Sequence, residues 1–133
     1  MNEEQENNLR KLSEYLLSDK VRMDFNMRIY CHKRSYDDVY LEYLDVAKRP
    51  DQTKCGTVGC ALGHGPDAGV ILPFMNISWT RYCWEAFGIL PFESDAWNYL
   101  FDASWAQYDN SASGAGRRLA KFIANDFKVP EDW

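Results

Sequence analysis

The sequence predicts a compact, mainly α-helical single domain that spans residues 1–133 and contains at most one short β-hairpin. A chain of 133 residues suits one domain. Its apolar share of 46% and aromatic share of 15% supply a hydrophobic core, which an intrinsically disordered chain would lack. Most apolar residues recur at helical spacing between residues that begin or end helices.

The N-terminal half contains three expected elements. Residues 3–18 are expected to form an amphipathic helix, since leucines recur every three or four residues on one face. Residues 22–31 alternate weakly in polarity and are interpreted as a short strand. Residues 35–50 have apolar residues at helical spacing and are interpreted as a helix that ends at Pro50, because proline cannot continue a helix.

A short helix is expected around residues 57–66. Thr57 is interpreted as its N-cap, Cys60 and His64 as part of its body, and the glycine and proline at 65–66 as its end.

Three helices are expected after residue 77. The clearest begins after Ser78, ends at Gly88 and has one apolar face made of Trp79, Tyr82, Cys83, Ala86 and Phe87. A shorter helix follows Ser94 and is expected to bury Trp97, Leu100 and Phe101. The last runs to about Asn125 with its inward face at Ala115, Leu119, Phe122 and Ile123. Trp133 is expected to cover the core.

Charge and hydropathy limit the function classes. The net charge of −5 argues against binding nucleic-acid backbones, which requires a basic surface. The N-terminus is acidic and polar, unlike a secretory signal, and the longest apolar stretch, GVILPFMNI, is too short to span a bilayer. We therefore expect a protein of the cytoplasm, without a membrane partner or a cofactor and with its four cysteines reduced.

The stretch KCGTVGCALGHGP at residues 54–66 has three interpretations. The favoured one is a packing turn, in which small residues allow close approach and cysteines are buried as small apolar groups. The second is a zinc-stabilised module with Cys55, Cys60 and His64 as ligands, joined by Cys31 or His32, although the spacing lacks a second cysteine pair. The third is a cysteine-dependent enzyme that uses Cys60 with His64 or His32 as the base.

The segment DNSASGAGRRL at residues 109–119 suggests an anion site at a helix N-terminus. Asp109, Asn110 and the following serines are capping residues, the glycines bare the backbone, and Arg117 and Arg118 are nearby. A small phosphorylated ligand could bind there and at the 56–65 turn, with Thr57 and His64. The favoured alternative is a well-capped helix whose arginines pair with surface carboxylates.

Exposed aromatic residues are candidates for contact with a protein partner. Trp84 lies off the apolar face of its helix, and Trp105 and Tyr108 lie in an expected connector. Aromatic side chains in such positions commonly anchor protein interfaces. Partial burial against the C-terminal tail is the alternative.

The order of motifs resembles a family of small uncharacterised phage and bacterial proteins. The matching segments are CGTVGCALGHGPDAGV at 55–70, FGI at 87–89 after a tryptophan and a tyrosine, AWNYLFDASWAQYDNSASGAGRRLAKFI at 96–123, and VPEDW at 129–133. The resemblance covers about residues 24–133 and departs at Gly116, where the family pattern has alanine.

The resemblance implies no activity and no catalytic residues, but it implies an accessory gene of a mobile element. Small acidic proteins of that kind often inhibit a host enzyme or defence complex. The leading hypothesis is therefore a non-enzymatic binding protein that inhibits a host defence system by holding a protein partner or a nucleotide signal. The cysteine enzyme and the zinc module are the alternatives.

Overall fold

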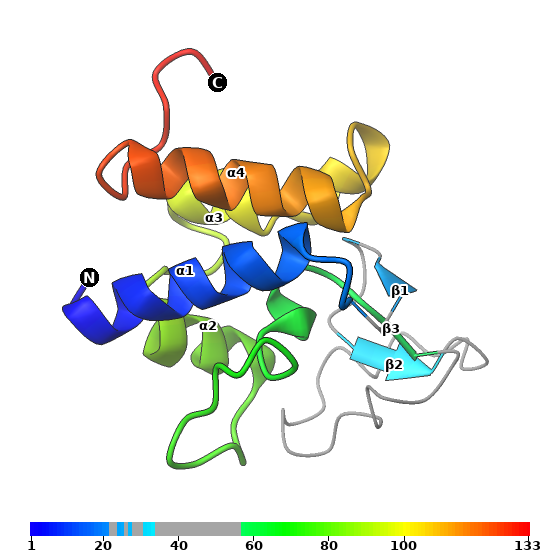
Figure 1. Cartoon of the computed structure of the whole chain (residues 1–133). Helices are drawn as coiled ribbons and strands as arrows, with labels where there is room; N and C mark the ends of the chain where they lie inside the picture. The colour runs from blue at the N-terminus through cyan, green and yellow to red at the C-terminus, as the bar shows by residue number, and fades with distance from the viewer. Residues whose placement is uncertain (22–23, 26, 28–30, 34–56) are drawn as a thin grey trace.

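The structure is a computed structural model that describes residues 1–21, 24–25, 27, 31–33 and 57–133. It is mainly helical, as the sequence predicts (Figure 1). The elements follow in the order α1 (Glu3–Leu17), β1 (Asp24–Phe25), β2 (Cys31–Lys33), β3 (Thr57–Gly59), the 3₁₀ helix η3 (Leu62–His64), α2 (Trp79–Phe87), α3 (Asp95–Leu100), the 3₁₀ helix η4 (Ala103–Gln107) and α4 (Ala112–Ala124).

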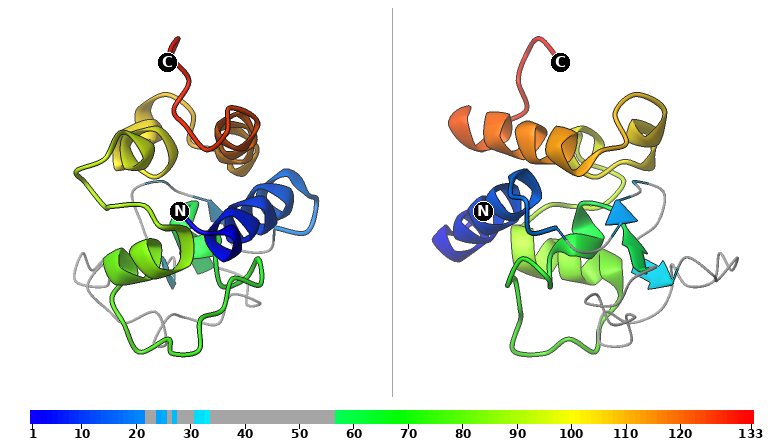
Figure 2. Two further views of the ribbon diagram at one scale, coloured as in Figure 1. Left: turned by 90° about the vertical axis from the view of Figure 1, so that its left-hand side faces the viewer. Right: turned by 45° about the vertical axis from the view of Figure 1, so that its right-hand side comes forward.

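The helices form two levels around one core (Figure 2). α3 and α4 lie side by side on one side, α2 lies on the opposite side, and α1 lies between them, packed mainly on α4 and also on α2. The small sheet lies beside the C-terminal end of α1, and the C-terminal tail, residues 128–133, rises on the outer side of α3 and α4 (Figure 1). The tail therefore lies on the same side of the core as α3 and α4, away from α2.

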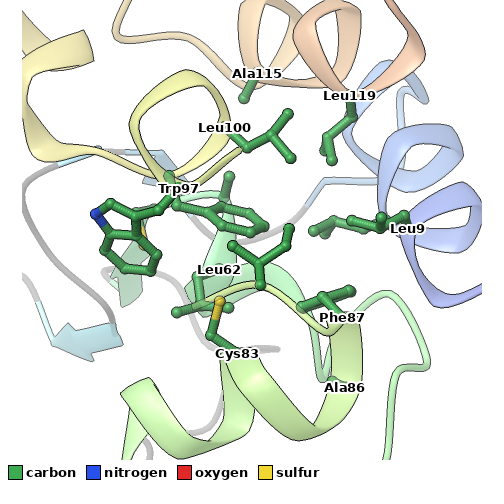
Figure 3. Close-up of a cluster of buried hydrophobic side chains, with 14 of the residues drawn as sticks. Leu9, Leu62, Cys83, Ala86, Phe87, Trp97, Leu100, Ala115 and Leu119 are labelled. Carbon is green, nitrogen blue, oxygen red and sulfur yellow. The ribbon is translucent and has the colours of Figure 1, made fainter. Parts of the chain in front are cut away.

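The core is made of apolar side chains from all four α-helices and η3. Figure 3 shows several of them directed to the centre: Leu9, Leu62, Cys83, Phe87, Trp97, Leu100 and Leu119. Trp79, Trp97 and Phe101 are buried, as predicted from the periodicity. Burying a large apolar side chain contributes about 1.5–3 kcal/mol, so this cluster provides the main driving force for folding.

The helix ends are set by local capping. Asn2 and Gln5 form a capping box at the start of α1, and Ser78 accepts a hydrogen bond from the backbone N–H of Arg81 at the start of α2. Gly88 ends α2 in the left-handed conformation with φ of 68°, as expected for a glycine after the last turn. The boundaries predicted for α2 are confirmed, and α1 ends at Leu17, one residue before its predicted end.

Two polar side chains of α1 satisfy the C-terminal carbonyls of α2. Asn8 Nδ2 donates to the carbonyl oxygen of Ala86 at 2.8 Å, and Gln5 Nε2 lies 3.3 Å from that of Glu85. The last carbonyls of a helix have no partner within the helix, so these contacts join α1 to α2 as well as satisfying them.

The structure corrects the expectation for Thr57. The residue lies in β3, paired with Lys33 of β2, and does not cap a helix. Threonine is β-branched and fits an extended strand, and pairing with a distant segment outweighs its capping tendency. The helical turn is shorter than expected and consists only of η3, whose N-cap position is Ala61.

The sheet is larger than a hairpin. β3 lies at its centre, parallel to β1 and antiparallel to β2. β1 falls within the strand expected at residues 22–31 and is only two residues long. The helix expected at residues 35–50 lies outside the described residues.

Candidate functional site

A pocket of about 380 Å³ lies between α3, η4, α4 and the C-terminal tail. We call it the arginine pocket. Its lining residues are Tyr99, Trp105, Asp109, Gly114, Arg117, Arg118, Lys121, Pro130, Asp132 and Trp133. Four of the predicted binding residues, Trp105, Asp109, Arg117 and Arg118, therefore meet in one place.

Arg118 is the central residue of the arginine pocket. It lies at the edge of the inward face of α4, three residues after the buried Ala115, and only 6% of its surface is exposed. Its guanidinium carbon lies 4.0 Å from the centre of the Trp105 ring, in a cation–π contact. Its Nε and Nη2 atoms are buried and have no hydrogen-bond acceptor among the described residues. Two charged donors of a residue that lines the pocket are therefore unpaired.

The environment of Arg118 weakens its charge without removing it. Burial lowers the pKa of Arg118 to about 10, with Arg117 adding to this effect and Asp109 and Tyr99 opposing it. The guanidinium is therefore still protonated at neutral pH. Burial, assisted by Asp132 and opposed by Arg118, raises the pKa of Tyr99, so that its phenol is neutral at the same pH.

The rim of the pocket carries further charges of both signs. Arg117 and Lys121, four residues apart on α4, lie on the same side of that helix. Asp109 and Asp132 contribute carboxylates. Together with Arg118, the pocket has three basic and two acidic side chains, so it has an excess of one positive charge at pH 7.

The first turn of α4 is occupied by a side chain of the protein. The Asp109 carboxylate lies against Gly114, where a Cβ atom would overlap it. Ser111 Oγ donates to Asp109 Oδ1 at 2.5 Å and accepts from the N–H of Gly114 at 3.0 Å. Arg117 Nη2 lies 3.6 Å from Asp109 Oδ2. The arrangement at Asp109, Ser111 and Arg117 is thus the capped helix with a surface ion pair that the sequence favours. Arg118, which is buried, does not fit that interpretation.

Aromatic rings form one wall of the arginine pocket. Trp105 is held by a hydrogen bond from Nε1 to the carbonyl oxygen of Asn98 at 3.0 Å. The Trp133 ring is stacked on Trp105 with centroids 6.4 Å apart, and its centroid lies 5.1 Å from that of Tyr99. Trp133 thus lies over the pocket and is 54% exposed, so it covers the edge of the core rather than its centre.

The other predicted binding residues lie elsewhere. Asn110 Oδ1 accepts from the backbone N–H of Met27 at 2.8 Å and so joins the connector before α4 to the segment after β1. Tyr108 is 78% exposed beside Trp105. Trp84 is exposed on α2, a helix that lies on the opposite side of the core from α4 (Figure 2). Thr57 lies in β3, and His64 is buried near the Tyr15 and Phe25 rings.

The segment of Cys60 and His64 has the geometry of a packing turn. Both residues are buried, and His64 Nδ1 lies 2.6 Å from the backbone carbonyl oxygen of Cys60. The Cys60 sulfur accepts a hydrogen bond from the N–H of Gly63 at 3.4 Å. A Cβ atom on Gly65 would lie 2.5 Å from the Tyr82 hydroxyl, which donates to the carbonyl of Val70. Residue 65 therefore has to be small, mainly because of the Tyr82 side chain and also because of the carbonyl oxygen of Leu62.

The zinc hypothesis falls partly outside the described residues, which include neither Cys55 nor the side chains of Cys31 and His32. Within the part of the chain that the structure describes, no cluster of three or more His, Cys, Asp or Glu residues could hold a metal ion.

Sequence reasoning missed five residues of the arginine pocket: Tyr99, Lys121, Pro130, Asp132 and Trp133 as a lining residue. Lys121 had a signal, because it follows Arg117 by one helical turn. No feature of the sequence identified the tail residues Pro130, Asp132 and Trp133 as pocket residues, because local sequence does not predict which helices a terminal segment will cover.

Comparison with protein-family models, curated proteins and solved structures found no match to this chain. The resemblance to a phage and bacterial family therefore stays a prediction. Among the helices of the described residues, none is both long and apolar enough to cross a membrane.

Proposed function

We propose that this chain is a non-enzymatic binding protein that holds an anionic group in the arginine pocket. The group belongs either to a small ligand or to a protein partner, as in the leading hypothesis from the sequence. Arg118 is the residue that binds it, and Arg117 and Lys121 attract it at the rim.

The observation that carries this proposal is the buried, unpaired guanidinium of Arg118. A buried charged group without hydrogen bonds is strongly unfavourable, and folded proteins contain few of them. An anion in the arginine pocket would supply acceptors to Nε and Nη2 and neutralise the charge. Charge-assisted hydrogen bonds to arginine are about twice as strong as neutral ones, which gives such an anion a reason to bind.

The proposal extends to the biological setting that the resemblance implies. If the chain is encoded by a phage, the occupant of the pocket is a host molecule, and the protein acts in the host cytoplasm as an inhibitor of a defence system. The exposed Trp84 and Tyr108 are the candidates for additional contact with a protein partner.

Thermal unfolding with anions tests the proposal. Sodium phosphate, acetate and phenylacetate, each at constant ionic strength, are added to the wild-type chain and to Arg118→Met, in which an apolar side chain of similar length replaces the guanidinium. We expect at least one anion to raise the melting temperature of the wild type by several degrees, because binding to the folded state alone stabilises it. Arg118→Met should lose that gain.

Arg81→Met is the matched control, since Arg81 is an exposed arginine on α2 whose guanidinium pairs with Glu85. It should keep the full response to the anion. A melting temperature that no anion raises, or that rises equally in wild type and Arg118→Met, would contradict the proposal.

A further inference from the structure

Resting on the proposed function, the geometry points to a specific ligand class: we infer that the arginine pocket takes a single carboxylate attached to a flat aromatic group. The carboxylate binds the Nε and Nη2 edge of Arg118, and the aromatic group packs on Trp133 and Trp105. The same chemistry occurs in small aromatic acids and at the C-terminus of a peptide that ends in an aromatic residue.

The unpaired atoms of Arg118 define the shape of the anion. Nε and Nη2 lie on one edge of the guanidinium, so their N–H groups point in parallel in the plane of the group. The Trp105 ring covers a face of the guanidinium at 4.0 Å, so a ligand has to reach the guanidinium along its edge. The Nε and Nη2 atoms on that edge are buried, so binding requires a local shift of the residues around them. Two coplanar oxygens on one carbon match this pair of donors, as in bidentate arginine–carboxylate pairs.

The charge of the pocket favours a monoanion. Arg117, Arg118 and Lys121 outnumber Asp109 and Asp132 by one. A carboxylate would leave the occupied pocket neutral, whereas a phosphate monoester, which is close to a dianion at neutral pH, would bring an unbalanced negative charge next to two carboxylates. The net charge of −5 on the whole chain also repels a dianion more strongly than a monoanion.

The rest of the lining favours a flat apolar body. Besides Arg118, the wall of the pocket is formed by the Tyr99, Trp105 and Trp133 rings and by Pro130. The ring centroids of Trp133 and Tyr99 are 5.1 Å apart, within the range of aromatic contact, and half of the Trp133 surface remains exposed. A ring attached to the carboxylate can therefore contact Trp133 without entering the core.

Isothermal titration calorimetry with four matched anions tests the inference on the full chain. Phenylacetate has the ring and one carboxylate, phenyl phosphate the ring and nearly two charges, methyl phenyl phosphate the ring and one charge on phosphorus, and acetate no ring. We expect phenylacetate to bind at least tenfold more tightly than phenyl phosphate or acetate. Methyl phenyl phosphate should bind more tightly than phenyl phosphate, since only the charge differs strongly.

Two substitutions assign the contacts. Trp133→Ala should reduce the affinity for phenylacetate several-fold and leave that for acetate unchanged. Phe74→Ala, which removes an exposed aromatic side chain beside Arg81 of α2, should change neither affinity. Because Trp133 lies at the surface, Trp133→Ala is informative even if Arg118→Met fails to fold. Unchanged phenylacetate binding in Trp133→Ala would overturn the inference.

The outcomes separate the inference from the proposed function. Phenyl phosphate binding as tightly as phenylacetate, in an Arg118-dependent way, overturns the inference and leaves the proposed function in place. No Arg118-dependent binding of any anion overturns both. A short peptide ending in phenylalanine then identifies the source: tighter binding of the peptide than of phenylacetate indicates a partner's C-terminus, and weaker binding indicates a free acid. If the peptide binds, its C-terminal amide should bind more weakly, and an amide that binds as tightly as the peptide overturns the inference.

Discussion

Arg118 combines features that are rarely found together in one residue that serves only the fold. It is buried, charged at neutral pH, in contact with an indole face, and lacks acceptors for Nε and Nη2 among the described residues. Such a residue lowers the stability of the free protein. Residues of this kind persist where binding requires them, because a binding site is often less stable than the core around it.

Replacing Arg118 by methionine should therefore stabilise the free protein. Methionine fills the same space and carries no charge that needs a partner, and substitutions of buried ionic groups by apolar ones are often neutral or stabilising by about 1–4 kcal/mol. We expect a higher midpoint of urea unfolding for Arg118→Met than for wild type in anion-free buffer. Arg81→Met, at an exposed position, should change the midpoint little.

The higher stability of Arg118→Met should be present throughout the neutral pH range. Because the folded-state pKa of Arg118, about 10, lies below the ordinary value of 12.5, the unfolded chain binds more protons between these two values. The cost of Arg118 is therefore complete below pH 10 and decreases above it. A wild-type protein that is more stable than Arg118→Met at pH 7 would show that the guanidinium has a structural partner.

At the residue scale, the sequence indicated part of the site. Arg117, Arg118, Asp109 and Trp105 could be identified because they lie within one short segment between capping residues and a helix. The sequence did not indicate that Arg118 is buried against Trp105 and the tail while Arg117 stays exposed beside Asp109, because segments outside α4 make that difference.

At the scale of elements, capping chemistry determines where helices begin and end. Asn2, Ser78, Ser94 and Ser111 each accept a hydrogen bond from the first turn of a helix, so the sequence predicts these starts from nearby residues. Thr57 shows the limit of such reasoning. Its strand depends on pairing with β1 and β2, which lie far away in the sequence.

Gly88 offers a direct test of this element-scale interpretation. Its φ of 68° is strained for any residue with a Cβ atom, and that atom would lie 2.7 Å from Gln5 Oε1, the side chain that links α1 to the end of α2. We expect Gly88→Ala to lower the free energy of unfolding by about 1–2 kcal/mol. Chemical denaturation measures the change.

Gly69→Ala is the matched control for Gly88→Ala. Gly69 also has a positive φ, of 92°, but a Cβ atom there would meet no atom within 4 Å. The difference between the two variants isolates the contact with Gln5. Equal destabilisation by both substitutions would show that backbone strain alone accounts for the loss at Gly88.

At the scale of the whole molecule, the hydrophobic core and the arginine pocket lie in different places. Cys60 and Cys83 are buried, and burial, together with Cys60, raises the pKa of Cys83 well above its ordinary value. The arginine pocket lies on the outer side of α3 and α4, beneath the tail.

Within the described residues, the hydrogen bonds that hold this tail are local: Asn125 Nδ2 donates to the carbonyl of Lys128, and Trp133 N–H donates to that of Pro130. The position of the tail thus depends on the packing of Val129 against the core and of Trp133 against Tyr99 and Trp105, which no short stretch of sequence encodes.

The most direct measurement of the central claim is a ¹H–¹⁵N spectrum of the arginine Nε–H groups during titration with phenylacetate. All arginines of the chain are observed together, and Arg118→Met assigns the Arg118 signal by its loss. The account predicts a saturable shift of the Arg118 Nε–H signal that is larger than any shift at Arg81, with a dissociation constant that matches calorimetry. An Arg118 signal that does not move while phenylacetate binds would contradict it.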